Sequence, residues 1–128
     1  MIVPQEIRDE IAAHAHAEAP NEACGVVVLR DGRAERYVRG RNREASPHRY
    51  RLEVDPEVWF LEDEGYELAV CHSHPREAPT GARPSRTDIE NIGLWEGRPC
   101  LILALASGEL AAFRIAGGRA EDLELQID

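Results

Sequence analysis

The sequence predicts a domain of the α/β or α+β class. One amphipathic segment of helical period opens the chain, and several short apolar runs bounded by turn residues follow it. The chain has 128 residues, 43% of them hydrophobic, which is enough for one core and too few for two ordinary domains. There is no internal repeat and no low-complexity segment. The order of the strands in the sheet does not follow from this pattern.

The first half of the chain should begin with a helix over residues 4–19. Pro4 suits the first turn of a helix, and apolar residues then recur at four-residue spacing until Pro20 and Asn21 end the segment. The elements expected next are a strand at 25–29, a hairpin turn at 30–33, a strand at 35–38, a polar loop at 39–47, a strand at 50–54 and a short helix at 55–63.

The second half should begin with a buried strand, because residues 67–72 are mostly apolar. A loop rich in proline and glycine covers residues 75–84. Ser85 suits the N-cap of a helix that we expect to continue to about Trp95. Three further strands are predicted at 100–105, 110–115 and 123–127, with glycine-containing turns between them.

Charge and composition exclude several classes of partner. The net charge of −9, without a basic stripe, disfavours nucleic acid as a partner. No apolar run approaches the roughly 20 residues needed to cross a bilayer, and the first residues do not resemble a signal peptide. The three cysteines, Cys24, Cys71 and Cys100, are an odd number without metal-type pairing. We therefore expect reduced thiols, packed as small apolar residues, and a cytoplasmic location.

Two histidines near the end of the strand at 67–72 are the main chemical feature. His72 and His74 are separated by one residue, so on an extended segment they point to the same side, while Cys71 and Ser73 point to the other. Asp88 supplies a carboxylate further along the chain. Three protein ligands with a fourth position for water are typical of a catalytic zinc ion, whereas structural zinc sites have four protein ligands. This pattern predicts a zinc hydrolase.

Each of these residues also has a simpler interpretation. Ser85 and Asp88 match an N-cap followed by an acidic residue in the first helical turn, which requires no catalysis. The two interpretations are compatible, because such a cap would fix both residues at a helix start facing the strand end. Glu22 alone would be an ordinary solvated carboxylate after a helix. The remaining histidines, at positions 14, 16 and 48, have no second ligand at useful spacing and should be solvated.

Taken together, Glu22, the HxHP motif at 72–75 and the SxxD motif at 85–88 resemble the signature of the JAMM metallopeptidases, also called MPN+ or JAB domains. The resemblance covers nearly the whole chain, as one domain over residues 1–128. It implies a central mixed β-sheet flanked by helices, of cytidine-deaminase-like architecture. It also implies a role for each matching residue: His72, His74 and Asp88 as ligands of Zn²⁺, Glu22 as general acid–base, and Ser85 as hydrogen-bond donor to the oxyanion.

The resemblance also suggests a substrate. The chain is similar to compact prokaryotic JAMM proteins, which implies cleavage of an amide or isopeptide bond at the Gly-Gly tail of a ubiquitin-like sulfur-carrier protein or its adduct. The alternatives are a non-catalytic MPN-type binding module, a protein of the phage-tail-assembly type, and a hydrolase of small non-peptide amides. No Pro-Cys-x-x-Cys motif of nucleobase deaminases is present.

One departure from the family pattern concerns the loop after the histidines. Thirteen residues, 75–87, separate His74 from Asp88, where about ten are usual in such a motif. Since loops tolerate insertions at small cost, we expect the zinc site to be kept and access to the cleft to be altered.

Overall fold

The computed structural model describes all residues from 1 to 128. Its elements, in chain order, are β1 (Ile2–Val3), α1 (Gln5–Glu18), β2 (Cys24–Arg30), β3 (Arg33–Arg39), β4 (Arg41–Asn42), β5 (Leu52–Glu53), the 3₁₀ helix η1 (Pro56–Glu64), β6 (Glu67–His74), α2 (Arg86–Glu90), the 3₁₀ helix η2 (Gly93–Trp95), β7 (Pro99–Ala104), β8 (Leu110–Ala116), β9 (Arg119–Leu123) and β10 (Gln126–Ile127). The α+β class predicted from the sequence is confirmed. None of the helices is long and apolar enough to cross a membrane.

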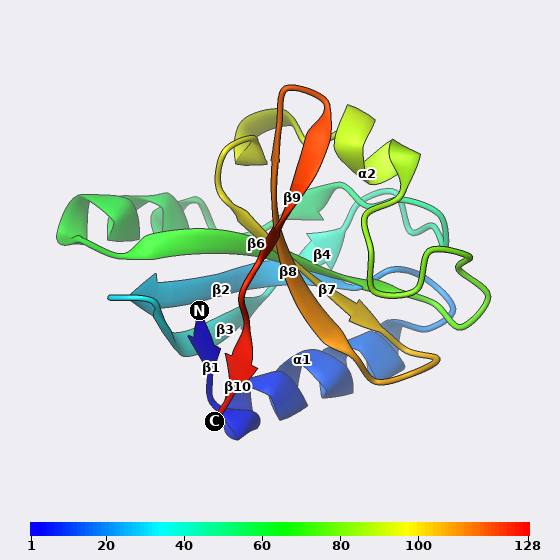
Figure 1. Ribbon diagram of the computed structural model, residues 1–128, viewed down its shortest axis with the longest axis horizontal. Helices are drawn as coiled ribbons and strands as arrows, with labels where there is room; N and C mark the ends of the chain where they lie inside the picture. The colour runs from blue at the N-terminus through cyan, green and yellow to red at the C-terminus, as the bar shows by residue number, and fades with distance from the viewer.

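A strongly curled sheet forms the centre of the molecule. Its eight strands follow the order β10-β1-β3-β2-β6-β7-β8-β9, and β6 and β7 run parallel in the middle. Strands β9 and β10 lie at opposite edges although only residues 124 and 125 separate them in the chain. The sheet must therefore curl until its edges approach each other, and β9 leads directly into β10 beside the N-terminus (Figure 1). A separate pair, β4 and β5, completes the strands.

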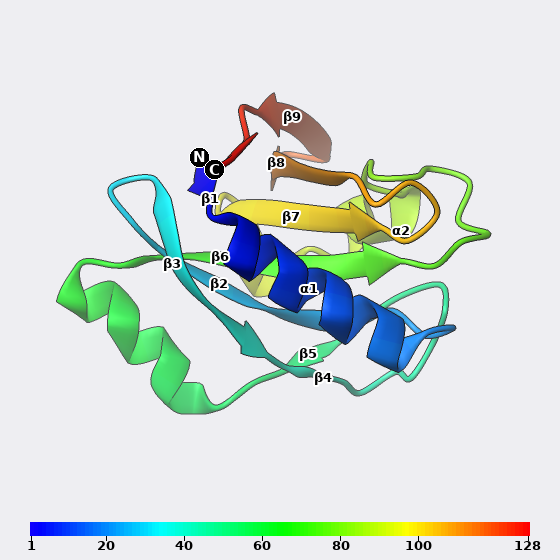
Figure 2. The ribbon, with the colours of Figure 1, turned by 90° about the horizontal axis from the view of Figure 1, so that it is seen from below.

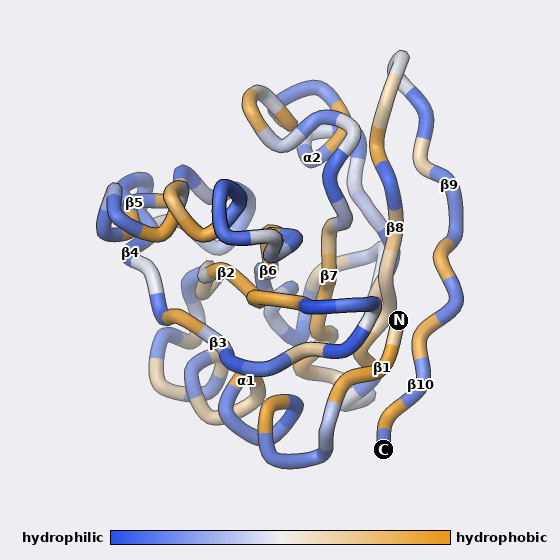
Figure 3. The backbone as a smooth tube through the Cα atoms, turned by 90° about the vertical axis from the view of Figure 1, so that its left-hand side faces the viewer, coloured by the Kyte–Doolittle hydropathy of each residue, from blue (hydrophilic) through white to orange (hydrophobic).

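Helix α1 covers one face of this sheet (Figure 2). The four-residue spacing noted in the sequence has the predicted consequence, because Ile7, Ile11 and Ala15 are buried against alternate residues of the central strands. Cys71 lies in the same cluster, which confirms that it faces the core. Since both faces of β2, β6 and β7 are covered, β2 and β7 are apolar along nearly their whole length and β6 is apolar over residues 68–71, while the connecting turns are hydrophilic (Figure 3).

A second apolar cluster covers the opposite face. It contains Val70 of β6 and Ile102 of β7 and is closed by side chains from the helical segments between β5 and β7, among them Val58 and Trp95. His72 lies on the same face as Val70, two residues further along the strand. His72 therefore continues the line of this second core.

Three predictions about elements are wrong in part. The strand expected at 50–54 is only the two-residue strand β5. The helix expected to run from Ser85 to Trp95 ends at Glu90, and a separate 3₁₀ turn follows, because Gly93 adopts a φ of +54° that an α-helix cannot contain. The strand expected at 123–127 is divided between β9 and β10. The two-residue strands β1 and β4 were not predicted, since a two-residue run has no measurable period.

Candidate active site

Strand β6 brings the two histidines to the edge of the second core. It is paired with β2 on one side and with β7 on the other, so His72 is opposite Cys24 and beside Ile102. His72 and His74 point to the same face, as their spacing predicts, and both are buried. Ser73 points the other way, and its Oγ accepts a hydrogen bond of 2.8 Å from the backbone N–H of Ala23. This bond fixes the end of β6 against the residue that follows Glu22.

Asp88 reaches the histidines from the start of α2. Ser85 is the N-cap of this helix, and its Oγ accepts from the N–H of Asp88 at 3.1 Å, while Asp88 Oδ2 accepts from the N–H of Ser85 at 2.9 Å. The pair is a reciprocal capping box. Both interpretations of this motif are thus compatible in one structure, because the cap itself places Asp88 beside the strand end.

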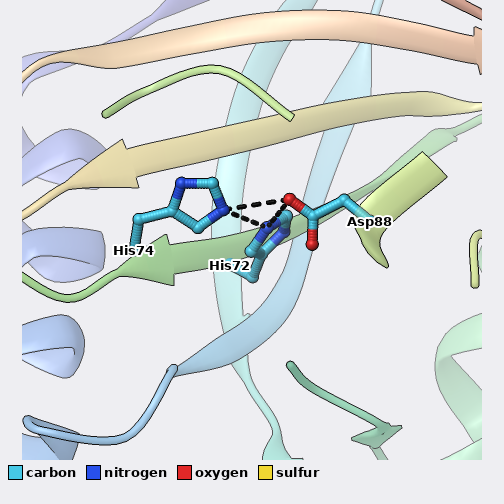
Figure 4. A group of neighbouring side chains, drawn as sticks. All are labelled: His72, His74 and Asp88. Atoms are coloured by element: carbon cyan, nitrogen blue, oxygen red, sulfur yellow. Dashed lines mark hydrogen bonds and ion pairs between the residues drawn. The ribbon is translucent and has the colours of Figure 1, made fainter. Parts of the chain in front are cut away.

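The three predicted ligand atoms converge on one point (Figure 4). Asp88 Oδ2 lies 3.2 Å from His72 Nε2 and 3.0 Å from His74 Nε2, and the two ring nitrogens are 3.2 Å apart. The Nδ1 atom of His74 lies 2.6 Å from the carbonyl oxygen of Gly81, which can only accept, so Nδ1 carries a proton and Nε2 of the neutral ring presents a lone pair.

This geometry fits a bound metal ion. Lone pairs that face one another at 3.0–3.2 Å repel unless a positive charge lies between them. Ligand atoms about 2.0–2.1 Å from a tetrahedral zinc ion are separated by about 3.3 Å. The donor set of two imidazoles and one carboxylate is also a set that zinc accepts.

The electrostatics of two of the three side chains, His72 and Asp88, favour the same conclusion. Burial lowers the pKa of His72, which keeps this ring neutral and able to bind a cation. Burial would also raise the pKa of Asp88, but the neighbouring histidines and the Ser85 N–H hold it well below its usual range. The pKa of His74 is raised, since its hydrogen bond and attraction to Asp88 outweigh burial. Protonation of His74 therefore competes with a metal ion for the same ring nitrogen.

Glu22 is a buried carboxyl group whose pKa depends strongly on its surroundings. It lies between α1 and β2, is 3% exposed, and its Oε1 has no hydrogen-bond partner. Its pKa is raised from 4.5 to about 8, first by burial and then by the charge of Asp88, with a partial offset from His74. A divalent cation at the histidines and Asp88 would lower this pKa again. Glu22 is thus far from the solvated carboxylate that its position in the sequence alone suggests.

A cleft of about 340 Å³ opens onto the cluster. Glu22, His74 and Ser85 are among the residues that line it, whereas His72 and Asp88 are not. Its walls come from two loops, one containing Pro47 and His48 and the other containing residues 75–80. The five predicted site residues therefore lie together, with Glu22 and Ser85 on the side from which a substrate can approach.

Several supporting contacts were not predicted. The longer loop supplies the Gly81 carbonyl that orients His74, and Thr80 Oγ1 lies 3.4 Å from the same ring nitrogen. The Tyr50 ring stacks on His72, with centroids 4.3 Å apart and planes at 23°. A sequence pattern cannot predict that the backbone carbonyl of Gly81 is a partner of His74. Tyr50 was interpreted only as part of a strand.

Two further expectations concern residues outside the cluster. The cysteines are free and buried, as predicted, and burial raises the pKa of Cys24 to about 12. The prediction that His14 is solvated is wrong: it is 3% exposed, and its Nδ1 lies 2.7 Å from the hydroxyl of Tyr37. The side chain fills the space between α1 and β3, which the helical periodicity of apolar residues did not reveal. His48 is exposed, as expected, and lines the cleft.

Comparison with known proteins agrees with this geometry. The family described as prokaryotic homologs of the JAB domain matches residues 4–116. The chain belongs to this family. Among curated relatives, this JAB-family chain is 35% identical over 94 residues to the CysO-cysteine peptidase of Mycobacterium tuberculosis, covering 70% of the chain and 64% of the relative. It is 44% identical over 85 residues to the tail tip assembly protein K of Escherichia phage N15, covering 66% of the chain and 33% of that protein.

A solved structure extends the comparison to the whole fold. The protein DSY2949 from Desulfitobacterium hafniense superposes with a TM-score of 0.79 at 28% identity, covering 100% of this chain and 93% of the other. The chain spans less than two thirds of the length of the curated relatives it matches, 64% and 33%. The JAB fold and membership of the JAB-domain family are therefore shown, along with a group of side chains that could hold a metal ion.

Proposed function

We propose that this JAB-family chain is a zinc-dependent peptidase or isopeptidase that hydrolyses an amide bond. The observation that carries the proposal is the convergence of His72 Nε2, His74 Nε2 and Asp88 Oδ2 within 3.2 Å of one another, beside a cleft that is also lined by Glu22 and Ser85. When bound, zinc would polarise the scissile carbonyl and lower the pKa of a water molecule, which makes a nucleophile available at neutral pH.

Side chains and one backbone carbonyl of the protein would provide proton transfer, oxyanion stabilisation and orientation of His74. Glu22 accepts the proton of the attacking water and delivers it to the leaving amine, a role that suits a buried carboxyl group whose pKa responds to a nearby cation. Ser85 uses its oxygen to accept from the Asp88 N–H, so its hydroxyl proton is free to donate to the oxyanion. The Gly81 carbonyl keeps the His74 ring in the required tautomer and orientation.

We further propose that the substrate is the Gly-Gly tail of a ubiquitin-like sulfur-carrier protein, or an amino-acid adduct of that tail. An extended tail of small residues can reach buried groups through a cleft with the rigid walls that Pro20, Pro47 and Pro79 supply. The relative named CysO-cysteine peptidase supports this class of substrate. A cytoplasmic location belongs to the same proposal and is supported by three buried free thiols.

The first test is metal content. Elemental analysis of protein purified without chelator should find about one zinc per chain, and a His72→Ala, His74→Ala double variant should have lost it. Asp88→Asn should bind zinc weakly, while Glu22→Gln should keep it, because the glutamate is not a ligand. Absence of zinc from the wild type after reconstitution would overturn the proposal in favour of a non-catalytic binding module.

The second test is turnover. A carrier protein whose Gly-Gly tail is amide-linked to cysteine should be cleaved, with the released carrier detected by mass spectrometry. Glu22→Gln should lower kcat by about 10²–10⁴-fold, the usual contribution of a general acid–base. If the zinc-loaded wild type and Glu22→Gln cleave equally fast, the role assigned to Glu22 is wrong.

A further inference from the structure

We propose that Asn42 is a positioning residue. Its side chain binds the loop 43–51 to the backbone of Glu22 and thereby holds Glu22 in the catalytic orientation. Asn42 ends the two-residue strand β4, and the loop leads from it to β5. The inference rests on the proposed function, since it concerns the residue assigned there as general acid–base.

The backbone of Glu22 is held on both sides by this part of the chain. Its carbonyl oxygen accepts a hydrogen bond of 3.0 Å from Asn42 Nδ2. Its N–H donates to the carbonyl oxygen of Ser46, inside the loop, at 2.9 Å. On the next residue, the Ala23 N–H is bound by Ser73 Oγ at 2.8 Å. Glu22 lies beyond the last residue of α1 and before the first of β2, so no helix or strand hydrogen bond fixes it otherwise.

The Asn42 side chain uses its full hydrogen-bonding capacity. Nδ2 donates to Glu22 O and to Arg49 O, at 3.0 and 3.1 Å, while Oδ1 accepts from Glu44 N and Arg51 N, both at 3.0 Å. Two carbonyls on one side and two N–H groups on the other determine which atom of the amide is nitrogen. Only a primary amide of this length satisfies all four partners. The side chain therefore joins both ends of the loop to the Glu22 peptide.

This arrangement has a functional consequence because the Glu22 carboxyl group has little else to hold it. Its Oε1 has no hydrogen-bond partner, so the direction of the side chain depends on its backbone and on packing. The same loop carries Pro47 and His48 into the wall of the cleft. Asn42 thus fixes the backbone from which the Glu22 carboxyl group extends. Displacing a catalytic group by about 1 Å can cost about 10²-fold in rate.

Asn42→Asp tests the inference with a minimal change. The aspartate keeps an acceptor for Glu44 N and Arg51 N but loses both donors and places a negative oxygen against two carbonyls. In steady-state cleavage of the carrier–cysteine adduct we expect kcat to fall about 10–100-fold, with KM changed less than about threefold and zinc content unchanged. Asn91→Asp, which adds the same charge at an exposed asparagine, is the matched control and should change kcat less than about twofold.

Two further measurements separate positioning from general damage. If Asn42 acts through Glu22, then adding Asn42→Asp to Glu22→Gln should lower the residual rate by less than about threefold, because the group being positioned is already inactive. If the two substitutions acted independently, the fold decreases in rate that each causes alone would multiply in the double variant. Amide hydrogen exchange should be faster at Glu22 in Asn42→Asp than in wild type, and this readout needs no turnover.

The possible outcomes are distinguishable. Equal kcat in Asn42→Asp and Asn91→Asp, or multiplicative losses in the double variant, would overturn the inference while leaving the peptidase proposal intact. A wild type without turnover but with the faster exchange at Glu22 in Asn42→Asp would overturn the peptidase proposal and keep the structural link. Unchanged exchange at Glu22 would show that Asn42 does not hold this backbone.

Discussion

Glu22 gives the sharpest quantitative prediction, because its burial couples folding to pH. In the folded protein its pKa is about 8, and in the unfolded chain it returns to about 4.5. Since the folded pKa is raised, the stability contribution of this group is complete below pH 4.5 and is lost as the pH rises to 8. The difference between these two pKa values lowers the free energy of unfolding by about 3 kcal/mol at pH 7 and by almost nothing at pH 4.

Replacing Glu22 by glutamine removes this loss. In protein treated with chelator, the free energy of unfolding of Glu22→Gln relative to wild type should therefore increase by about 3 kcal/mol between pH 4 and pH 7. Urea unfolding at several pH values measures it. Glu10→Gln, at an exposed position, is the control and should change stability by less than about 0.5 kcal/mol at either pH.

The metal provides a second check on the same reasoning. With zinc present, the cation should lower the pKa of Glu22, so the advantage of glutamine at pH 7 should shrink. A pH-independent difference between Glu22→Gln and wild type in the metal-free protein would refute the argument, because it would mean that burial does not hold the carboxyl group protonated.

Three other substitutions test separate features. Ser85→Ala should lower the free energy of unfolding, measured in urea, by about 1 kcal/mol, because it removes the cap on the Asp88 N–H. It should also lower kcat for cleavage of the carrier adduct about 10²-fold, and an unchanged kcat would show that Ser85 does not stabilise the oxyanion. Gly25→Ala should destabilise by about 2–3 kcal/mol, since a Cβ there would lie 2.5 Å from the Val38 carbonyl oxygen; a thermal midpoint equal to that of wild type would contradict this. Burial lowers the pKa of His14, so the contribution of this group to stability should be lost as the pH drops below about 6.5, by at most about 1.4 kcal/mol per pH unit; the free energy of unfolding of His14→Gln relative to wild type, measured by urea unfolding, should therefore rise as the pH falls over this range, and a difference independent of pH would contradict the argument.

Most of the fold was predictable because its central strands are buried on both faces. Continuous apolar runs mark β2, β6 and β7, and the four-residue spacing marks the buried side of α1. The curl of the sheet was not predictable, because it depends on pairings between β1, β3 and β10 that involve one or two residues each. Such short ladders leave no pattern in a sequence.

The cluster around the histidines was predictable for a different reason. Strand parity places His72 and His74 on one side, and the preference of serine for a helix N-cap places Asp88 at a helix start. The supporting contacts could not be predicted in the same way. Asn42 and Gly81 act through backbone groups of residues distant in the sequence, and such contacts depend on how two loops meet across the cleft.

The oxygen Oδ2 of Asp88 serves two purposes at once. It completes the cap of α2 by accepting from Ser85 N, and it lies nearest both imidazoles. A helix of five residues has no stability of its own in water. The order of α2 and the occupancy of the cluster are therefore thermodynamically linked, so that a chelator acting on the histidines should also loosen a segment of secondary structure. The shared atom also constrains evolution: moving this carboxylate along the helix would remove the cap on which the start of the helix depends.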